Sequence, residues 1–471
     1  MTKTGPELIH DYFDRLAPHR RRWIKRNRFY HRTLQRHFRM IIPEGSTVLE
    51  LGCGTGDLLS AVRPAVGIGV DFSETMVALA REAHPDLTFY QADATDFKTG
   101  IRFDYVILSD LLSSLWDIQA VIRNLRELIH PRTKIIISSY NYVWEPMLRL
   151  GEFLRIKARQ PLQSWLTIRD IEGLLRLEEF EIIKVDRKLL IPKYIPIVNF
   201  IFNTFLANLP GINSLCLVNM ISARPMHRKE EDYSVSIVVP ARNERGNIEN
   251  AIRRTPEFGS RQEFIFIEGN SSDQTYEEML RVKEAYPDKD IRVMKQSGKG
   301  KGNAVREAFE VATGDILMIL DADLTTPPED MPKFYEALSR NRGEFINGCR
   351  LVYPMEKEAM RFLNFLANKF FGWFFSFLLG QRLKDTLCGT KVLFKKDYEL
   401  IKANRHYFGD FDPFGDFDLL FGAAKLNLKI TEVIVRYRDR EYGSTQISRF
   451  RHGLLLIRMS LFAARKIKFT A

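Results

Sequence analysis

The chain has 471 residues, with 45% hydrophobic and 27% charged residues and a formal net charge of +11. This length suits two globular domains better than a single core, and the composition is that of an ordinary globular protein rather than of a fibre or a disordered chain. The positive charge favours anionic partners such as nucleotides, phospholipid headgroups or nucleic acid, without choosing among them.

The cysteines and the hydropathy pattern exclude further classes. Four cysteines lie far apart and form no CxxC pair, which argues against a disulfide framework or a structural zinc and favours a reducing compartment. They are Cys53, Cys216, Cys349 and Cys388. The first residues lack the apolar core of a secretory signal, and no run of about 18 apolar residues predicts a membrane-spanning helix. We therefore expect a cytoplasmic protein, peripheral on the inner face of the membrane.

Apolar strand candidates alternate with turns or helices along both halves. In the first half they are 47–52, 66–72, 87–93, 103–110 and 134–140, and in the second 235–241, 263–269, 291–296 and 315–323. The repetition predicts an α/β protein with a parallel sheet in each half. The densely charged segment 224–232 separates the halves. The expected parts are a basic helical extension (1–40), a first domain (41–225), a linker (226–232), a second domain (233–440) and a basic amphipathic tail (441–471).

A glycine-rich turn, Glu50–Gly56, follows the first strand and precedes a helix. Glycines at such a turn let a ligand approach the backbone, and the helix N-terminus offers free N–H groups to an anionic group. A dinucleotide-binding GxGxxG is excluded because the third glycine falls one residue early. Asp71 ends the second strand, where a carboxylate can take both ribose hydroxyls, and Asp93 ends the third, near the expected edge of an adenine.

In order and spacing these residues resemble a class I S-adenosylmethionine-dependent methyltransferase, over about residues 40–225. The resemblance implies a Rossmann-like fold and S-adenosylmethionine as cofactor. The cofactor-binding residues that it implies are Glu50, Gly52, Gly54, Gly56, Asp71, Phe72, Asp93, Ala94 and Ser109. Asp110 follows Ser109 near the methyl group. Asp110 and Asp117 are candidate bases, although each is also typical of a loop or a helix cap, so the methyl acceptor stays open.

The second half carries four polar elements in order, at 236–244, 268–275, 298–302 and 321–323. The last of them, Asp-Ala-Asp, directly follows an apolar strand. Two carboxylates spaced in this way can share a divalent cation, Mg or Mn, whose other positions are filled by diphosphate oxygens. Such a cation neutralises a nucleoside-diphosphate leaving group, and lysines of a glycine-rich loop add charge beside the same phosphates.

This half resembles glycosyltransferase family 2, and especially its polyprenyl-phosphate hexosyltransferases, over about residues 233–440. The resemblance implies the GT-A fold of nucleotide-diphospho-sugar transferases, an inverting reaction and a nucleotide-diphospho-sugar donor. The donor-binding residues that it implies are Pro240, Arg242, Glu244, Glu268, Lys299, Lys301, Asp321 and Asp323, and the last two are also the metal ligands. The family commonly has Asp-Asp-Gly-Ser where this chain has Glu268-Gly-Asn-Ser, so the base of the nucleotide stays open.

The acceptor is expected at residues 361–391. The uncharged stretch 370–381 is too short to span a bilayer but long enough to lie in its interface, and a pair of buried core helices is the alternative. The resemblance places Asp385 and Lys391 near an acceptor phosphate. The catalytic candidates are Asp323, Asp385, Asp416 and Asp418. A phosphate acceptor needs no general base, whereas a hydroxyl does. We favour a lipid-phosphate acceptor and keep a soluble saccharide or metabolite as the alternative.

Three further segments favour a membrane surface. The tail 449–468 mixes apolar and basic residues, and residues 194–223 carry no charge. The latter suit an interfacial hairpin or an insertion before a last strand at 215–223. Arg20–Arg39 has nine basic residues, no acidic one and interleaved aromatic residues, which suits a helix over the cofactor site, a headgroup-binding face or a solvated face. Nucleic acid is not expected as a partner. A protein in which one half only binds its ligand is the remaining alternative.

Overall fold

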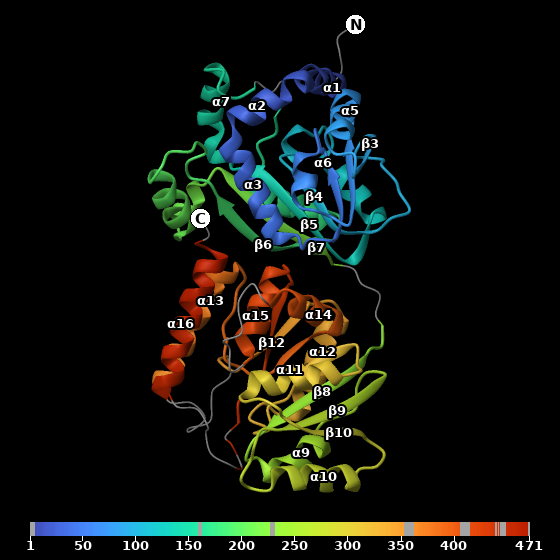
Figure 1. The fold of residues 1–471 in the computed structure, drawn as a ribbon, viewed down its shortest axis with the longest axis vertical. Coiled ribbons are helices and arrows are strands. Elements are labelled where there is room, and N and C mark those ends of the chain that lie inside the picture. The colour runs from blue at the N-terminus through green and yellow to red at the C-terminus, as the bar shows by residue number, and fades with distance from the viewer. Residues whose placement is uncertain are drawn as a thin grey trace. The chain divides into compact units, whose positions relative to one another are not determined.

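The computed structural model describes residues 5–158, 163–226, 231–352, 362–405, 415–438, 440, 442 and 449–469 (Figure 1). The side chains of residues 5, 6, 362–367, 416 and 449–456 are outside this description. The chain divides into two compact units. The first contains Met1–His227 with Lys468–Ala471, and the second contains Arg228–Ile467.

The first unit is built on a seven-stranded sheet with the order β3-β2-β1-β4-β5-β7-β6. Its strands are β1 Thr47–Leu51, β2 Val66–Asp71, β3 Thr88–Gln91, β4 Phe103–Ser109, β5 Ile129–Tyr140, β6 Phe180–Lys188 and β7 Val218–Pro225. Strands β1–β5 are parallel, but β7 runs antiparallel to both β5 and β6. The expectation of a wholly parallel sheet is therefore wrong at β7. The physical reason is that β6 and β7 are consecutive and adjacent, like the arms of a long hairpin.

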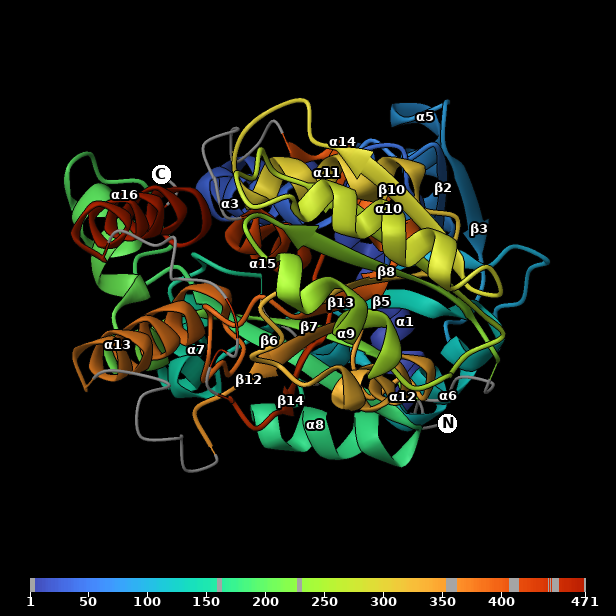
Figure 2. The same ribbon diagram turned by 90° about the horizontal axis from the view of Figure 1, so that it is seen from below.

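Helices cover both faces of this sheet. They are α1 Gly5–Leu16, α2 Arg20–Arg26, α3 Arg28–Ile41, α4 Asp57–Ala61, α5 Glu74–Ala83, α6 Ile118–Asn124, α7 Glu145–Phe153 and α8 Ile168–Leu177. Buried side chains of α3, α4 and α5 form one core cluster, and those of α6 and α8 form another on the opposite face (Figure 2). The basic run Arg20–Arg39 is thus two helices, which divide at Asn27.

The uncharged segment 194–223 forms most of an insertion between β6 and β7, residues 189–217, and continues into β7. This agrees with one of the two expectations. It contains a π-helix at Phe200–Phe205 and 3₁₀ turns at Leu206–Asn208 and Ile212–Leu215 before it enters β7. Asn199 and Asn203 hold its start by hydrogen bonds to the backbone of Ile191. These two asparagines therefore stabilise the start of the insertion.

The second unit has a seven-stranded sheet with the order β10-β9-β8-β11-β13-β12-β14. Its strands are β8 Ser234–Ala241, β9 Arg261–Glu268, β10 Asp290–Lys295, β11 Ile316–Ile319, β12 Phe345–Cys349, β13 Lys391–Phe394 and β14 Ile430–Ile434. Here β13 is antiparallel to β11 and β12, so the expected parallel sheet is wrong at this strand too. Its helices are α9 Ile248–Arg253, α10 Thr275–Ala285, α11 Lys301–Val311, α12 Met331–Ser339, α13 Phe362–Leu379, α14 Lys395–Ala403, α15 Asp416–Lys425 and α16 Arg449–Ile467.

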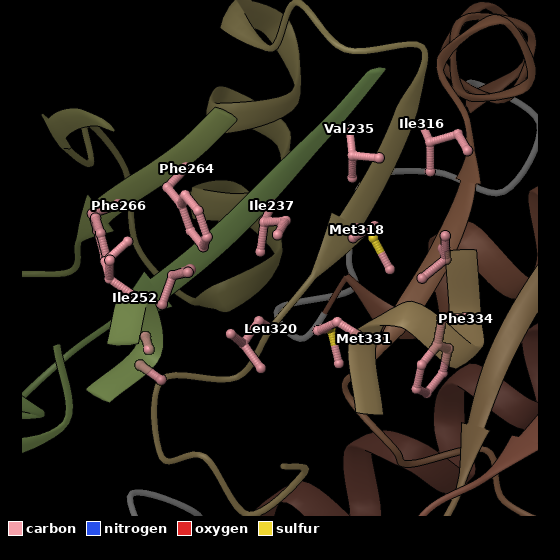
Figure 3. Packing of buried hydrophobic residues seen from close by; sticks show 14 of the residues in the cluster. Val235, Ile237, Ile252, Phe264, Phe266, Ile316, Met318, Leu320, Met331 and Phe334 are labelled. Carbon is pink, nitrogen blue, oxygen red and sulfur yellow. The ribbon is translucent and has the colours of Figure 1, made fainter. Parts of the chain in front are cut away.

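Alternate residues of the central strands build the main core of the second unit. Val235 and Ile237 of β8 lie beside Phe264 of β9 and Met318 of β11, and Phe334 of α12 packs into the same cluster (Figure 3). Residues at i and i+2 of a strand share one face, which explains the alternation. The intervening residues are also buried, because helices cover both faces of a parallel sheet.

The apolar segment 370–381 lies mostly in helix α13. Phe375 is fully buried and packs on Phe417 and Phe421 of α15, with ring centroids 5.1 and 5.4 Å away, whereas Phe370 and Trp373 are exposed. One face of the helix therefore belongs to the core and the other presents aromatic rings. Within the described part of the chain, no helix has the length and hydropathy that crossing a membrane requires.

Truncating the Phe334 side chain should destabilise the second unit. Phe334→Ala leaves a cavity in a fully buried cluster, and we expect a loss of about 3–5 kcal/mol in the free energy of unfolding. Phe334→Leu should lose about half of that. Denaturant unfolding measures the loss of stability. Hydrogen exchange in peptides from β8 and β11 shows whether the loss affects this core. Equal stability of the alanine variant and the wild type would contradict this packing.

Candidate active sites

The glycine turn after β1 is folded back onto the end of β2. Gly52, Gly54 and Gly56 have φ values of 70°, 53° and 75°, in the left-handed region that favours glycine. The amide of Gly54 donates to Asp71 Oδ2 at 2.8 Å. A Cβ atom at Gly54 would meet no atom of the described residues within 4 Å, so the turn forms a cradle that is open to a ligand on this side. Gly56 differs, because a Cβ there would lie 2.7 Å from the Phe89 ring. A Cβ at Gly52 would likewise lie 2.6 Å from the Leu111 side chain. Close packing therefore requires glycine at both positions, and their ligand-binding role stays a prediction.

Asp71 and Asp93 lie beside one cavity of about 450 Å³, together with Phe72 and Ala94. Asp71 is buried, and its Oδ1 accepts the amide N–H of Ser73 at 3.0 Å. Burial raises the pKa of Asp71, against the opposing effect of its two amide donors. Asp93 Oδ1 accepts the amide and hydroxyl of Thr95 at 2.8 and 2.7 Å. The two predicted acids thus sit at one cavity, as strand ends of a parallel sheet allow.

A second cavity of about 580 Å³ adjoins the first and shares Gly52, Asp71 and Phe72 with it. Its other walls come from α1–α3, α7 and the segment after β6. The N-terminal residues that line it include Tyr12, Phe13, Leu16, Arg20, Trp23, Tyr30 and His31. Sequence reasoning named Trp23 and Tyr30 in the basic run, for which it allowed a helix over the cofactor site, and missed the residues of α1. The aromatic residues interleaved in the basic run were the available signal.

Asp110 carries the main polar network of the second cavity. It has a left-handed φ of 53°, and its carboxylate accepts the Tyr30 hydroxyl at 2.6 Å and the Ser138 hydroxyl at 2.8 Å. Burial raises the pKa of Asp110, and these hydroxyls oppose the rise. Ser109 also contacts Ser138, with 3.1 Å between the two hydroxyl oxygens. In contrast, Asp117 caps α6 by accepting the Ala120 amide at 2.9 Å. Of the two candidate bases, only Asp110 has this network.

Glu50 supplies a test of whether a cofactor fits. It is buried, and its Oε2 atom has no hydrogen-bond partner among the residues that the structure describes. Burial raises the pKa of Glu50 well above its ordinary value. It also lines a small hollow with Gly52 and Ser109. This Glu50 oxygen beside the glycine cradle can accept a hydrogen bond from a ligand that carries an ammonium or another donor group.

In the second unit, the two carboxylates of the Asp-Ala-Asp motif both have cationic partners. Asp321 pairs with Lys301 at 2.6 Å, and Asp323 pairs with Arg440 Nη2 at 2.5 Å. Asp323 Oδ1 also accepts the amide and hydroxyl of Thr325. For Asp321 burial is the largest effect and raises the pKa, but Lys301 and more distant cations outweigh it, so the pKa is lowered. Strand β11 ends at Ile319, which leaves both acids in the loop.

Arg440 joins this motif to the predicted donor residue Glu244. Its Nη1 lies 3.1 Å from Glu244 Oε1, and Asn247 donates to the other oxygen at 2.8 Å. Burial raises the pKa of Glu244 to about 7, although Arg440 and Asn247 lower it. Sequence reasoning missed Arg440, because 117 positions separate it from Asp323 and no motif surrounds it.

The other donor candidates surround the same strand ends. Pro240 is half-buried in β8, and the buried Glu268 accepts the Ser271 amide. Arg242 and Lys299 are exposed. Four non-glycine residues near these loops have left-handed φ values, a strain that often accompanies binding loops. They are Asn243, Asn270, Gln274 and Leu324.

The residues expected at the acceptor are held inside the protein. Asp385 is fully buried and pairs with Arg350 through both oxygens, at 2.7 and 2.9 Å. Lys391 is also fully buried and donates to the carbonyl of Cys388. A carboxylate that a guanidinium holds through both oxygens is a fixed ion-pair partner, so Asp385 holds Arg350 in place. Its catalytic role stays a prediction.

Asp418 is also paired with an arginine. It is buried in α15, and Arg405 Nε donates to its Oδ2 at 2.9 Å. Asp416 begins α15, but its side chain lies outside the described residues. For the metal, no group of three or more histidine, cysteine, aspartate or glutamate side chains gathers within the described residues. Asp321 and Asp323 fit a cation only if Lys301 or Arg440 turns away.

The two sheets, each with its acids and turns at strand ends, define a pair of α/β transferase domains. Comparison with protein families identifies them. Residues 20–185 match the family model described as a methyltransferase domain, and residues 236–399 match glycosyl transferase family 2. The chain thus contains one domain of each family.

Curated relatives match the second domain. Dolichol-phosphate mannosyltransferase of Pyrococcus furiosus is 35% identical over 179 residues, which cover 36% of this chain and 49% of that protein. Undecaprenyl-phosphate 4-deoxy-4-formamido-L-arabinose transferase of Klebsiella pneumoniae is 32% identical over 222 residues, which cover 45% and 62%. The chain therefore spans about half to two thirds of the length of these relatives.

Solved structures resemble the chain over a similar share. A putative methyltransferase of Haloferax volcanii has a TM-score of 0.37 and 18% identity, and the match covers 47% of this chain and all of that one. Magnesium protoporphyrin IX methyltransferase of Synechocystis PCC 6803 has a TM-score of 0.34 and 19% identity, with 47% and 99% covered.

The raised pKa of Glu244 predicts a pH dependence of stability. The folded protein retains a proton up to pH about 7, whereas the unfolded chain releases it near the ordinary value of 4.5. The stability that this group contributes therefore falls as the pH rises through that window, by at most about 3 kcal/mol. Glu244→Gln removes the titration, so the stability advantage of the wild type over this variant should shrink from about pH 5 to about pH 8.

Denaturant unfolding at a series of pH values measures this difference. Glu277→Gln, at an exposed position of α10, is the control and should leave the pH profile unchanged. A profile of Glu244→Gln parallel to that of the wild type would show that Glu244 titrates normally.

Proposed function

We propose that the chain is a bifunctional transferase. Its second domain transfers a sugar from a nucleotide-diphospho-sugar to a lipid-linked acceptor, with polyprenyl phosphate as the favoured one. Its first domain transfers a methyl group from S-adenosylmethionine to a molecule of the same pathway. The observation that carries the proposal is the pair of strand-end clusters around Asp71 and around Asp321 and Asp323.

At the sugar-transfer site, cationic side chains suit the diphosphate of the donor. Lys301 and Arg440 pair with the two carboxylates of the Asp-Ala-Asp motif and can turn toward a more negative group. A divalent cation, Mg or Mn, held by Asp321 and Asp323 would neutralise the leaving diphosphate. We propose such a cation, with Lys301 or Arg440 then moved onto phosphate oxygens.

The state of the candidate bases supports a phosphate acceptor. A phosphate oxygen is already anionic near neutral pH, so its attack on the anomeric carbon needs no base. Of the two acids that a hydroxyl acceptor would call upon, Asp418 is engaged by Arg405, and the side chain of Asp416 lies outside the described residues. The names of the two curated relatives specify polyprenyl-phosphate substrates, which agrees with this acceptor. We accordingly propose a peripheral position on the cytoplasmic face of a membrane.

At the methyl-transfer site, Asp71 would hold the ribose and Asp93 with Ala94 the adenine. The cradle of Gly52 and Gly54, with Glu50 behind it, would take the methionine part. The cofactor supplies an electrophilic methyl group on a sulfonium, so that alignment of the acceptor provides much of the rate. Asp110, fixed by Tyr30 and Ser138, would hold the polar group of the acceptor.

Removing Asp323 should stop consumption of the nucleotide sugar. Asp323→Ala loses a carboxylate of the motif and leaves Arg440 without that partner, and we expect turnover to fall by at least about 100-fold. Release of nucleoside diphosphate from a panel of nucleotide sugars, with a membrane lipid extract and Mg or Mn, measures it. Asp288→Ala, in an exposed loop, is the control. Full turnover by Asp323→Ala would refute the assignment.

Removing Asp71 should weaken binding of S-adenosylmethionine. Asp71→Ala loses the expected ribose contact and the hydrogen bond to the Gly54 amide, so we expect affinity to fall by about 10–100-fold. Isothermal calorimetry measures the affinity, and far-ultraviolet circular dichroism checks that the variant is folded. Asp86→Ala, exposed in the turn before β3, should bind like the wild type. Unchanged affinity of Asp71→Ala would place the cofactor elsewhere.

A further inference from the structure

The first unit exposes large apolar side chains on α7 and on the insertion 189–217. Phe153 of α7 is 83% exposed and Ile197 of the insertion is 76% exposed, and Met147, Leu150 and Phe200 are also exposed. Large apolar side chains that are exposed together on neighbouring segments are typical of an interaction site. In both Figure 1 and Figure 2, α7 and the insertion, which is drawn in green, lie on the left side of this unit.

Specific contacts join these segments into one surface. The Trp144 indole donates to the carbonyl of Leu215 at 2.7 Å, which ties the start of α7 to the end of the insertion. Lys193 donates to the carbonyl of Arg26 at 3.1 Å and to the Asn27 side chain at 2.8 Å. The Phe29 and Tyr194 rings pack with centroids 5.6 Å apart. The insertion therefore bridges α7 to the junction of α2 and α3.

Helices α2 and α3 add a basic face to this surface. Their exposed cationic residues include Arg21, Arg22, Lys25, Arg32, Arg36 and Arg39. Neither helix contains an acidic residue, and in the described part of the chain none of these six side chains pairs with a carboxylate. Exposed apolar residues flanked by cations are typical of proteins that lie on an anionic lipid surface, where each cation near the headgroups contributes to binding.

The cavity of about 580 Å³ opens at the same surface. Met147 and Ile156 both line the cavity and are exposed to solvent. Its walls from α1, α7 and the segment after β6 are mainly apolar. Its polar end contains Asp110 and Tyr30, beside Gly52 and Gly54 of the cofactor cradle. The cavity thus leads from the apolar surface to the place where a methyl group would be transferred.

We propose that this surface docks on an anionic lipid bilayer, and that the methyl acceptor is a membrane amphiphile whose polar end enters the cavity. This inference rests on the proposed methyl transfer and names its acceptor class. Because Asp110 accepts hydrogen bonds, the group that it holds is a donor, and we assign a hydroxyl. The hydroxyl oxygen forms the new bond to the methyl carbon. The methyl–sulfur bond breaks with its electrons on sulfur, and the hydroxyl proton passes to the Asp110 carboxylate.

Vesicle binding by the full chain tests the docking surface. The probes are vesicles of phosphatidylcholine with and without one third phosphatidylglycerol, and sedimentation measures the bound fraction. Leu150→Ser with Phe153→Ser removes apolar contact, and Arg32→Glu with Arg36→Glu reverses charge. We expect each double variant to bind anionic vesicles at least about tenfold more weakly than the wild type. All four positions are exposed, so folding should be unaffected.

Matched controls come from α8, outside this surface. Leu177 is 66% exposed and Arg169 is exposed on the same helix, so Leu177→Ser and Arg169→Glu repeat the chemical changes elsewhere. Both should bind vesicles like the wild type. Three outcomes would overturn the docking surface. They are an equal loss of vesicle binding in the controls, equal vesicle binding by all variants, and capture of a protein in place of lipid at these residues.

Label transfer tests the acceptor class. The full chain is incubated with S-adenosylmethionine labelled in its methyl group and with vesicles of a total membrane lipid extract, and the organic and aqueous phases are then separated. We expect label in the lipid phase, and a loss of that label in the two surface variants, whose affinity for S-adenosylmethionine is unchanged. Label only on water-soluble products would overturn the acceptor class. Absence of S-adenosylmethionine binding would contradict the proposed function. Vesicle binding needs no cofactor, so it tests the docking surface independently of that result.

Discussion

Both sites depend on one constraint, which is the cost of burying carboxylates at the ends of parallel strands. A carboxylate removed from water needs donors or cations around it, and without them its pKa rises. The two units meet this need differently. In the first, Asp71 and Asp110 are held by amides and hydroxyls, and one oxygen of Glu50 has no partner in the described part of the chain. In the second, the acids of the Asp-Ala-Asp motif are held by Lys301 and Arg440.

This difference matches the charge of the ligands that we propose. Neutral donors leave the acids of the first site uncompensated, and their pKa values are raised. Such a site favours a ligand with positive charge, as the sulfonium and ammonium of S-adenosylmethionine provide. Cationic partners in the second site keep the pKa of Asp321 low and bring extra positive charge to the strand ends. That site suits a diphosphate, which can take over the cations.

Features that depend on a few neighbouring residues could be predicted from the sequence. The continuous apolar runs placed nine strands in the correct regions, and the glycine turn and the acids after it meet at one cavity. Strands β6, β12, β13 and β14 were not predicted. The side chains of β6 are mostly half-buried and form no apolar run. The reversals at β7 and β13 were missed because strand direction depends on pairing between distant segments. For the same reason Arg440, and the internal partners of Asp385 and Asp418, could not be found from local motifs.

The position of Arg440 links donor binding to the state of the acids. Its guanidinium bridges Glu244 and Asp323, which come from the loops after β8 and β11. A donor diphosphate, as we propose it, would compete for the same guanidinium, and the proposed divalent cation would compete for the same carboxylate. If the diphosphate and the cation bind together, Arg440 can leave Asp323 and pair with a phosphate oxygen. The cation then takes the place of Arg440 on Asp323. Every charge in the buried site thus keeps a partner. Either ligand alone would leave one uncompensated charge, which burial makes costly. The geometry therefore favours entry of donor and metal as one complex.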